Sequence, residues 1–405
     1  MFIRLITMIA LPLMISSLIT GITSLGDARQ LGKIGFKTAF FFVFTMLIAS
    51  TMAATVAYVV HPGSYFPADF TLHLSAQPSP FQPLGSIPHV GESTQFHSDL
   101  GSPSLHDFKL FILSSIPDNP FSALASGSFV PAIVFTLIFG VSLALIGDTA
   151  RPVVSFFEAI FAATMKIVDW LMILAVPGVF SLAFTVFSHS GFQLFGQMFP
   201  YMACVVGALL IQAFVIYPIL LWVFARVNFL DLYRAVSEAL LVAFGTASSS
   251  ATLPVTLACI ERRAGVSNRI ASFVLPTGAT MNMNGTTIFE VIAVMFLAQL
   301  YGVPMEPMTV VTIVLLAIVA AIGCAGVPSV GLVTMALVLN GVGHFQPEQI
   351  STGLALLWSV DRLLDMCRTT VNVIDDAAVS TMIAASEGEL NRDLLTSKTG
   401  WQEVI

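Results

Sequence analysis

The sequence contains few charged residues, and this scarcity excludes most classes of soluble protein. Only 10% of its 405 residues are Asp, Glu, Lys or Arg, whereas an average soluble domain has roughly 25%. The 16 basic residues are outnumbered by 23 acidic ones, so no basic surface is available to follow a nucleic-acid backbone. Apolar residues make up 56% of the chain, and the mean hydropathy is +0.90. The sequence therefore predicts an all-α, polytopic membrane protein.

Cysteine and histidine are also sparse, which argues against a metal centre or a catalytic site. The four cysteines form no Cys-x-x-Cys pair, so neither a disulfide framework nor a zinc site is indicated. The seven histidines all lie in predicted external turns without a fixed ligand spacing. A serine protease would need a base near its nucleophile, and no predicted membrane segment contains a histidine. We therefore expect no enzyme activity and no cofactor.

Long apolar segments dominate what remains, and the basic residues between them set the orientation. Arg29, Lys33 and Lys37 place the first connection on the cytoplasmic side, where short loops are enriched in Lys and Arg. The long polar stretch 61–122 then lies outside. The segments are continuous instead of alternating, which excludes a porin-like barrel. They cover about residues 2–24, 34–60, 129–147, 153–187, 193–225, 235–260, 270–300, 309–343 and 350–386.

Two of these segments break the alternation of sides, and each predicts a re-entrant hairpin. Segment 235–260 has arginines on both flanks, so it enters and leaves on the cytoplasmic side, with residues 248–252 at its tip. Segment 309–343 has no Lys or Arg in either flanking turn, so it enters from the opposite face, with residues 323–329 at its tip. Opposed interrupted segments indicate a secondary-transporter site. The alternative is that the small residues only allow helices to pack closely.

The last apolar segment carries several polar residues on one helical face. Spacings of three and four residues align them, and each buried charge costs about 2.5 to 3.5 kcal/mol. A polar cavity explains this stripe. The alternative is a structural Asp365–Arg368 salt bridge, which would leave Asp361, Asn372 and Asp376 without partners. The stripe consists of Asp361, Asp365, Arg368, Thr369, Asn372 and Asp376.

The preceding segment contains the run Gly278-Ala-Thr-Met-Asn-Met-Asn-Gly-Thr286, in which consecutive polar residues and glycines predict a break in the helix. Unwound carbonyls, together with Asn282, Asn372 and Asp376, would offer hard oxygen ligands to a small cation such as sodium. Half-helix N-termini and Arg368 would attract an anionic substrate. The sequence thus predicts an ion site beside a substrate site.

These motifs resemble the dicarboxylate/amino acid:cation symporter family, which includes glutamate and aspartate transporters, over almost the whole chain. The specific parts are Ser248-Ser-Ser-Ala-Thr-Leu-Pro-Val-Thr256, Asn282-Met-Asn-Gly-Thr286, Gly326-Val-Pro328 and Asp365-x-x-Arg-Thr-x-x-Asn-Val373. The resemblance implies a homotrimer whose mobile transport domains carry substrate by an elevator movement. It also implies location in a plasma membrane, in bacteria the inner membrane. An ion channel would need rings of charge or carbonyls around an axis, which the opposed hairpins do not suggest.

The resemblance implies a role for each site residue. Arg368 would bind the substrate's side-chain carboxylate and Asp365 its ammonium group, which favours an acidic amino acid over a C4-dicarboxylate or a neutral amino acid. Glu290 would carry a proton, or would bond neighbouring carbonyls. The remaining substrate residues would be Ser249, Ser250, Thr286, Val327, Thr369 and Asn372, and the sodium ligands would be Gly278, Thr280, Asn282, Asn372 and Asp376.

The same resemblance implies a division into domains. We expect a scaffold helix at 1–30 with the family's first helix missing, a transport-domain helix at 31–60, an extracytoplasmic loop at 61–122, scaffold helices at 123–192, a transport domain at 193–390 and a cytoplasmic tail at 391–405. Within the transport domain we expect a hairpin at 235–260, a broken helix at 266–300, a hairpin at 309–343 and a polar helix at 347–388.

At one of the family's sodium sites, this chain departs from the family's pattern. Relatives use the Asp of an Asn-Met-Asp-Gly-Thr break with a nearby Tyr, Thr and Ser, whereas this chain has Asn284, Phe42 and Met46 and keeps only Thr45. Phe and Met supply no oxygen for a hard cation. The sequence therefore predicts that this sodium site is absent. Asp365 also lacks the basic neighbour usual in relatives, and Arg362 is a candidate to replace it.

Overall fold

The computed structural model describes residues 32–66, 116–125, 129–164, 193–322 and 330–396, with single residues within 12–23, 166–170 and 324–328. All regular elements in this part of the chain are helices, and Val266 and Leu390 form an isolated β-bridge. The all-α class predicted from the sequence is therefore confirmed for these residues. Most of the predicted scaffold helix at 1–30, most of the loop at 61–122 and Val327 lie outside them.

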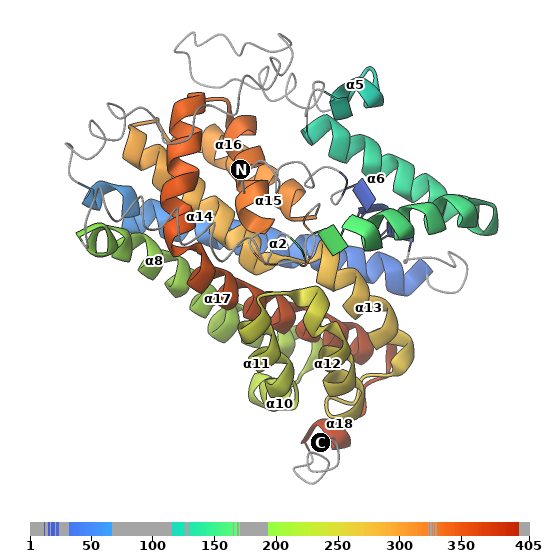
Figure 1. Ribbon diagram of the computed structural model, residues 1–405. Helices are drawn as coiled ribbons and strands as arrows, with labels where there is room; N and C mark the ends of the chain where they lie inside the picture. The colour runs from blue at the N-terminus through green and yellow to red at the C-terminus, as the bar shows by residue number, and fades with distance from the viewer. Residues whose placement is uncertain are drawn as a thin grey trace.

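Figure 1 shows the helices in their order along the chain. One helical stretch, at residues 151–164, has no label. The others are α2 (Gly32–Val60), η1 (Pro62–Tyr65), α5 (Pro120–Ala125), α6 (Phe129–Ile146), η2 (Gly147–Ala150), α8 (Gln193–Ile211), the π-helical η3 (Gln212–Ile216), α9 (Tyr217–Leu220), the π-helical η4 (Leu221–Ala225), α10 (Phe229–Ala235), α11 (Ser237–Thr246), α12 (Ser249–Arg262), α13 (Asn268–Met281), α14 (Asn284–Tyr301), α15 (Pro307–Ile322), α16 (Val330–Val342), α17 (Pro347–Glu387) and α18 (Arg392–Thr396).

Among the described residues, four stretches are long and apolar enough to cross a membrane, by length and composition. They are Lys33–Tyr65, Val134–Thr164, Gly196–Ala225 and Asn268–Tyr301. In α2 the large side chains of Phe36, Phe40 and Leu47 are exposed, whereas the hydroxyl groups of Thr45 and Ser50 are buried. This arrangement places apolar groups outside and polar groups inside, as a membrane environment favours.

The core forms around α14, in which every residue except Gln299 and Tyr301 is buried. This helix packs against α2, α8, α15 and α17. Glycine permits its closest approach to α17, because a Cβ at Gly285 would lie 2.4 Å from the Arg368 carbonyl oxygen. The break between α13 and α14 falls at Asn282 and Met283, inside the predicted polar run.

Two helix pairs occupy the stretches for which hairpins are predicted. The helices α11 and α12 pack side by side and are joined by Ala247 and Ser248, while α15 packs against α16. An ion pair between Arg263 and Glu238, 2.7 Å long, joins the open end of the first pair. Figure 1 shows the two pairs on opposite sides of the molecule, and α17 contacts both.

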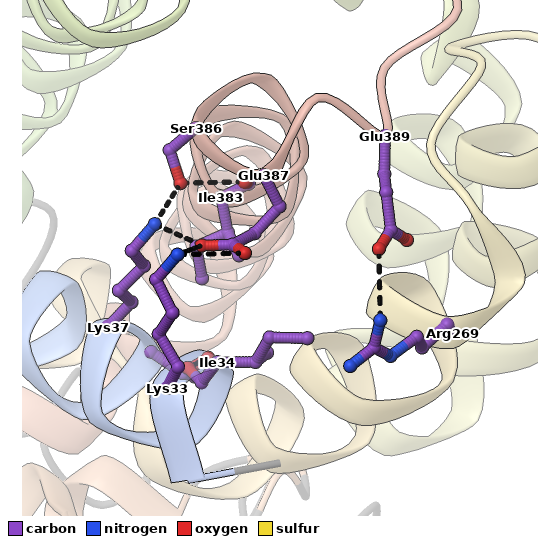
Figure 2. Close-up of polar contacts among 9 residues, drawn as sticks. Lys33, Ile34, Lys37, Arg269, Ile383, Ser386, Glu387 and Glu389 are labelled. Atoms are coloured by element: carbon purple, nitrogen blue, oxygen red, sulfur yellow. Dashed lines mark hydrogen bonds and ion pairs between the residues drawn. The ribbon is translucent and has the colours of Figure 1, made fainter. Parts of the chain in front are cut away.

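The helix α17 is long, with 41 residues that span about 60 Å at a rise of 1.5 Å per residue. It begins with Pro347 and a capping box formed by Gln346 and Gln349, and it ends at Gly388, whose φ of 73° favours glycine. Ion pairs secure its last turn, as Figure 2 shows: Lys33 and Lys37 of α2 both reach the Glu387 carboxylate.

Candidate functional site

Arg368 is the centre of a buried charged cluster on α17. Its side chain is 1% exposed, and Nη2 lies 2.7 Å from Asp365 Oδ1 and 3.0 Å from Asp361 Oδ1. The three residues are three and seven positions apart, which places them on one face of the helix. Two carboxylates therefore share one guanidinium group.

This geometry corrects the expectation that an Asp365–Arg368 bridge leaves Asp361 without a partner. Asp361 pairs with the same guanidinium because two helical turns return it to nearly the same direction. A structural salt bridge thus accounts for three of the charged residues on the stripe. It does not account for Asp376, which lies farther along the helix. Arg362, the candidate neighbour of Asp365, has an exposed side chain.

Arg368 also keeps donors free on its other side. Its Nη1 and Nε atoms are buried and form no hydrogen bond with any described residue. The guanidinium carbon lies 3.9 Å from the centre of the Phe289 ring, a distance typical of a cation–π contact. A Cβ at Gly331 would meet Nη1 at 3.2 Å and Thr286 at 3.3 Å. Residues of α14, α16 and α17 therefore converge on a guanidinium group that can bind an anion.

The tips of the two helix pairs meet close to this position. The Gly326 carbonyl oxygen accepts hydrogen bonds from Ser248 Oγ at 2.6 Å and from Ser250 N at 3.2 Å. A Cβ at Gly326 would lie 2.5 Å from the Ala279 carbonyl oxygen, so this tip also touches the end of α13. Ser249 is buried at the start of α12. The serine tip, the glycine tip and the broken helix are thus brought together.

Three of the predicted sodium ligands lie together at the break. Asn282 Nδ2 donates to Asp376 Oδ1 at 2.9 Å, and Asn282 Oδ1 is buried without a hydrogen-bond partner among the described residues. A Cβ at Gly278 would lie 2.2 Å from Asp376 Oδ1. Only glycine therefore leaves room for this carboxylate, which approaches the end of α13.

The other predicted polar residues are placed differently. Asn372 Oδ1 accepts a hydrogen bond from Gly285 N at 2.7 Å, so its amide holds the start of α14. Thr280 donates to the Thr277 carbonyl oxygen at 3.1 Å. Thr369 is buried beside Arg368 on α17. Their roles in binding remain predictions.

Glu290 lies inside the protein and contacts the second helix pair. Its Oε1 accepts a hydrogen bond from Thr334 of α16, while Oε2 is buried and has no hydrogen-bond partner among the described residues. Glu290 therefore links α14 directly to the helix that follows the glycine tip. This contact is compatible with either role left open by the sequence.

Sequence reasoning missed Asp375 on α17 and Tyr217 at the start of α9. Asp375 is fully buried and accepts a 2.6 Å hydrogen bond from Asn284 Nδ2, which also contacts the Tyr217 hydroxyl at 3.2 Å. The signal available in the sequence was an Asp pair, Asp375–Asp376, in an apolar helix. An intramembrane carboxylate is a candidate functional residue wherever it falls on the helix.

Known proteins resemble this chain over most of its length. A family model described as the Sodium:dicarboxylate symporter family matches residues 1–386. The "Proton/glutamate-aspartate symporter" of Escherichia coli (strain K12) is 34% identical over 395 residues, which cover 96% of this chain and 85% of that protein. The "Proton/sodium-glutamate symport protein" of Bacillus caldotenax is 31% identical and the "C4-dicarboxylate transport protein" of Rhodospirillum rubrum 30%; each alignment covers 97% of this chain, and 87% and 83% of the relative.

Proposed function

Because the chain belongs to the sodium:dicarboxylate symporter family, we propose that this membrane transporter imports an acidic amino acid, glutamate or aspartate, with sodium ions, protons or both. The relatives named as glutamate and aspartate symporters support this substrate class. The observation that carries the choice within the chain is the buried cluster of Arg368 with Asp361 and Asp365.

The shared guanidinium suggests how one site binds both ends of an amino acid. Nη1 and Nε of Arg368 are available to a side-chain carboxylate of the substrate. Asp361 can then keep Arg368 in position while Asp365 turns to bind the substrate's ammonium group. A buried arginine that kept neither carboxylate would be left as an uncompensated charge, at a cost of several kcal/mol.

A C4-dicarboxylate is the second candidate, since the Rhodospirillum rubrum relative is named as a transporter of that class. Such a substrate has no ammonium group, so Asp365 would remain paired with Arg368. A neutral amino acid would need Asp365 but would leave the free donors of Arg368 unused. The acidic amino acid is the candidate that uses both groups.

Helix lengths support two re-entrant hairpins, which an elevator mechanism would move across the membrane. The arms α11, α12, α15 and α16 contain 10, 14, 16 and 13 residues, or about 15 to 24 Å of helix. A membrane core is about 30 Å thick, so each arm is too short to cross it. In this proposal the chain acts as a homotrimer in a bacterial inner membrane, and the hairpins move with the substrate.

For coupling, one sodium ion would bind at Gly278, Asn282 and Asp376, with Asn372 nearby. Thr280 would be a ligand of a second sodium ion. Glu290 is the proposed proton carrier, because its carboxylate is buried against Thr334. Loss of that proton would leave a charge at the contact between α14 and α16.

Uptake by purified protein in proteoliposomes tests the proposal. Radiolabelled glutamate, aspartate, succinate and alanine are compared under imposed sodium or proton gradients. We expect accumulation of glutamate or aspartate above the other two, and loss of the proton-driven part in Glu290→Gln. Preference for succinate would favour the C4-dicarboxylate, and gradient-independent equilibration of all four would indicate a channel.

A further inference from the structure

Asp375 is a fully buried carboxylate that the proposed site does not use. Its Oδ2 accepts hydrogen bonds from Asn284 Nδ2 at 2.6 Å and from Thr45 Oγ1 at 3.1 Å. Its Oδ1 is buried and has no hydrogen-bond partner among the described residues. Three elements, α2, α14 and α17, therefore meet around a carboxylate with unused binding capacity.

No cationic side chain in the described part of the chain contacts Asp375. The titratable groups that face it are Asp376 on α17 itself and the phenols of Tyr217 and Tyr233, none of which brings a positive charge. Buried charges in proteins are paired or bind cations. When ionised, Asp375 has the charge needed to bind a monovalent cation, and the described residues provide no cationic partner for it.

The surrounding groups are oxygen donors of the kind that hard cations prefer. Thr45 supplies a hydroxyl and Tyr217 a phenol, while Asn284 has a second buried oxygen, Oδ1, without a hydrogen-bond partner. The Asn284 amide now directs its NH₂ group at both Asp375 and Tyr217. Turning that amide by half a revolution would direct Oδ1 at the same two groups and give a set of oxygens around one position.

We propose that Asp375, Asn284, Thr45 and Tyr217 form a sodium site, separate from the one at Gly278, Asn282 and Asp376. This deepens the proposed function, on which it rests for the role of the ion in transport. It also revises the sequence expectation of a lost sodium site near Asn284. The carboxylate missing from position 284 is supplied by the neighbouring helix α17.

Sodium binding by the purified full chain in detergent tests the site without reference to the substrate. Binding of ²²Na⁺ and the sodium-dependent rise in melting temperature are measured for the wild type and Asp375→Asn. The amide preserves the shape and can still accept hydrogen bonds from Thr45 and Asn284, but it removes the charge. We expect one fewer sodium ion bound, or at least about tenfold weaker apparent affinity, because ligand charge sets affinity at such sites.

Ser380→Ala is the matched control on the same helix. Ser380 is buried and its hydroxyl donates to the Ala377 carbonyl oxygen of its own helix, so its substitution should leave sodium binding unchanged. The sharper variant is the exchange Asn284→Asp with Asp375→Asn, which moves the carboxylate across the contact. It should restore the sodium ion lost in Asp375→Asn, and a purely structural role for Asp375 does not predict such recovery.

Unchanged sodium binding in a folded Asp375→Asn protein would overturn the site, as would failure of the exchange variant to recover the ion although it is folded. A change in the number of protons bound, with sodium binding unaltered, would also overturn it. If the wild type bound sodium through Asp375 but did not carry acidic amino acids, the substrate proposal would fail and the site would stand.

Discussion

The buried carboxylates at the two ends of the polar stripe on α17 have different kinds of partner. Toward its start, Asp361 and Asp365 share the guanidinium of Arg368 within 3.0 Å. Toward its end, Asp375 and Asp376 accept hydrogen bonds from the amides of Asn284 and Asn282. The first pair has a cation built into the chain. For the second pair, no ion pair with a cationic side chain occurs among the described residues.

This difference separates recognition from coupling along a single helix. A fixed guanidinium suits a substrate that carries its own carboxylate, because the protein supplies the opposite charge. Carboxylates held by neutral amide and hydroxyl groups suit cations that arrive from solution, since buried charges are otherwise costly. Each of the next substitutions changes one end of the stripe, and the measurements test whether the function of the other end changes too.

Removal of the built-in cation should have the largest effect. Arg368→Cys should reduce acidic amino-acid uptake by at least about 10²-fold, because charge-assisted hydrogen bonds to a buried carboxylate are worth several kcal/mol. Uptake of small neutral amino acids should persist or rise, since Asp365 can still bind the ammonium group. Radiolabelled uptake of aspartate and alanine in parallel measures the change.

Neutral amino-acid uptake also serves as the folding control for this variant, in which Asp361 and Asp365 lose their shared partner. Unchanged aspartate affinity in a folded Arg368→Cys protein would contradict the substrate assignment. Sodium binding at the Asp376 end should remain measurable, and its loss would show that the two ends are not independent.

Asp365→Asn should have the next largest effect, with a sign that depends on the substrate. The variant loses the partner of the ammonium group, so the apparent affinity for aspartate should fall about tenfold or more. Asp361 still balances the Arg368 charge, so any transport of succinate or malate should be spared. Competition assays with both substrates measure the ratio, and full aspartate transport would refute the role of Asp365.

A smaller, purely steric change tests the end of the stripe at Asp376. In Gly278→Ala the new Cβ would lie 2.2 Å from Asp376 Oδ1, so the carboxylate must move away from the break. We expect sodium affinity to weaken about tenfold while substrate affinity at saturating sodium changes little. Gly245→Ala is the matched control, because a Cβ there meets nothing within 4 Å. Equal sodium dependence in the two variants would remove Asp376 from the ion site.

Much of this arrangement could be predicted because it depends on residues that lie close together in the sequence. Basic residues on both flanks of 235–260 indicated a helix pair, and helices α11 and α12 lie close to those bounds. The run around Asn282 and Asn284 predicted the break between α13 and α14. Spacing alone aligned the stripe on α17, because helical periodicity depends only on positions along the chain.

The partners of the carboxylates could not be predicted, because they depend on which helices pack together. Asp375 itself could have been placed, because it lies three residues after Asn372 and seven after Arg368 and so falls on the face of the stripe. Its neighbours Thr45 and Asn284 come from α2 and α14, far away in the sequence. Tyr217 stands in an apolar segment without any polar pattern. These contacts are set by tertiary packing.

The weakest predicted effect lies at the exposed end of α17, where charges are paired near solvent. Hydrogen bonding from Lys37, with Lys33 close by, holds the pKa of Glu387 below its usual range. A lowered pKa in the folded state stabilises the protein above the unfolded pKa, about 4.3, and this contribution disappears as the pH falls through the folded pKa. Glu387→Gln should therefore lower the melting temperature by about 1 °C at pH 7 and by nothing measurable at a pH below the folded pKa of Glu387. Melting curves at both pH values, with and without 0.5 M salt, measure it; an equal shift at both would show that Glu387 acts through packing instead of charge.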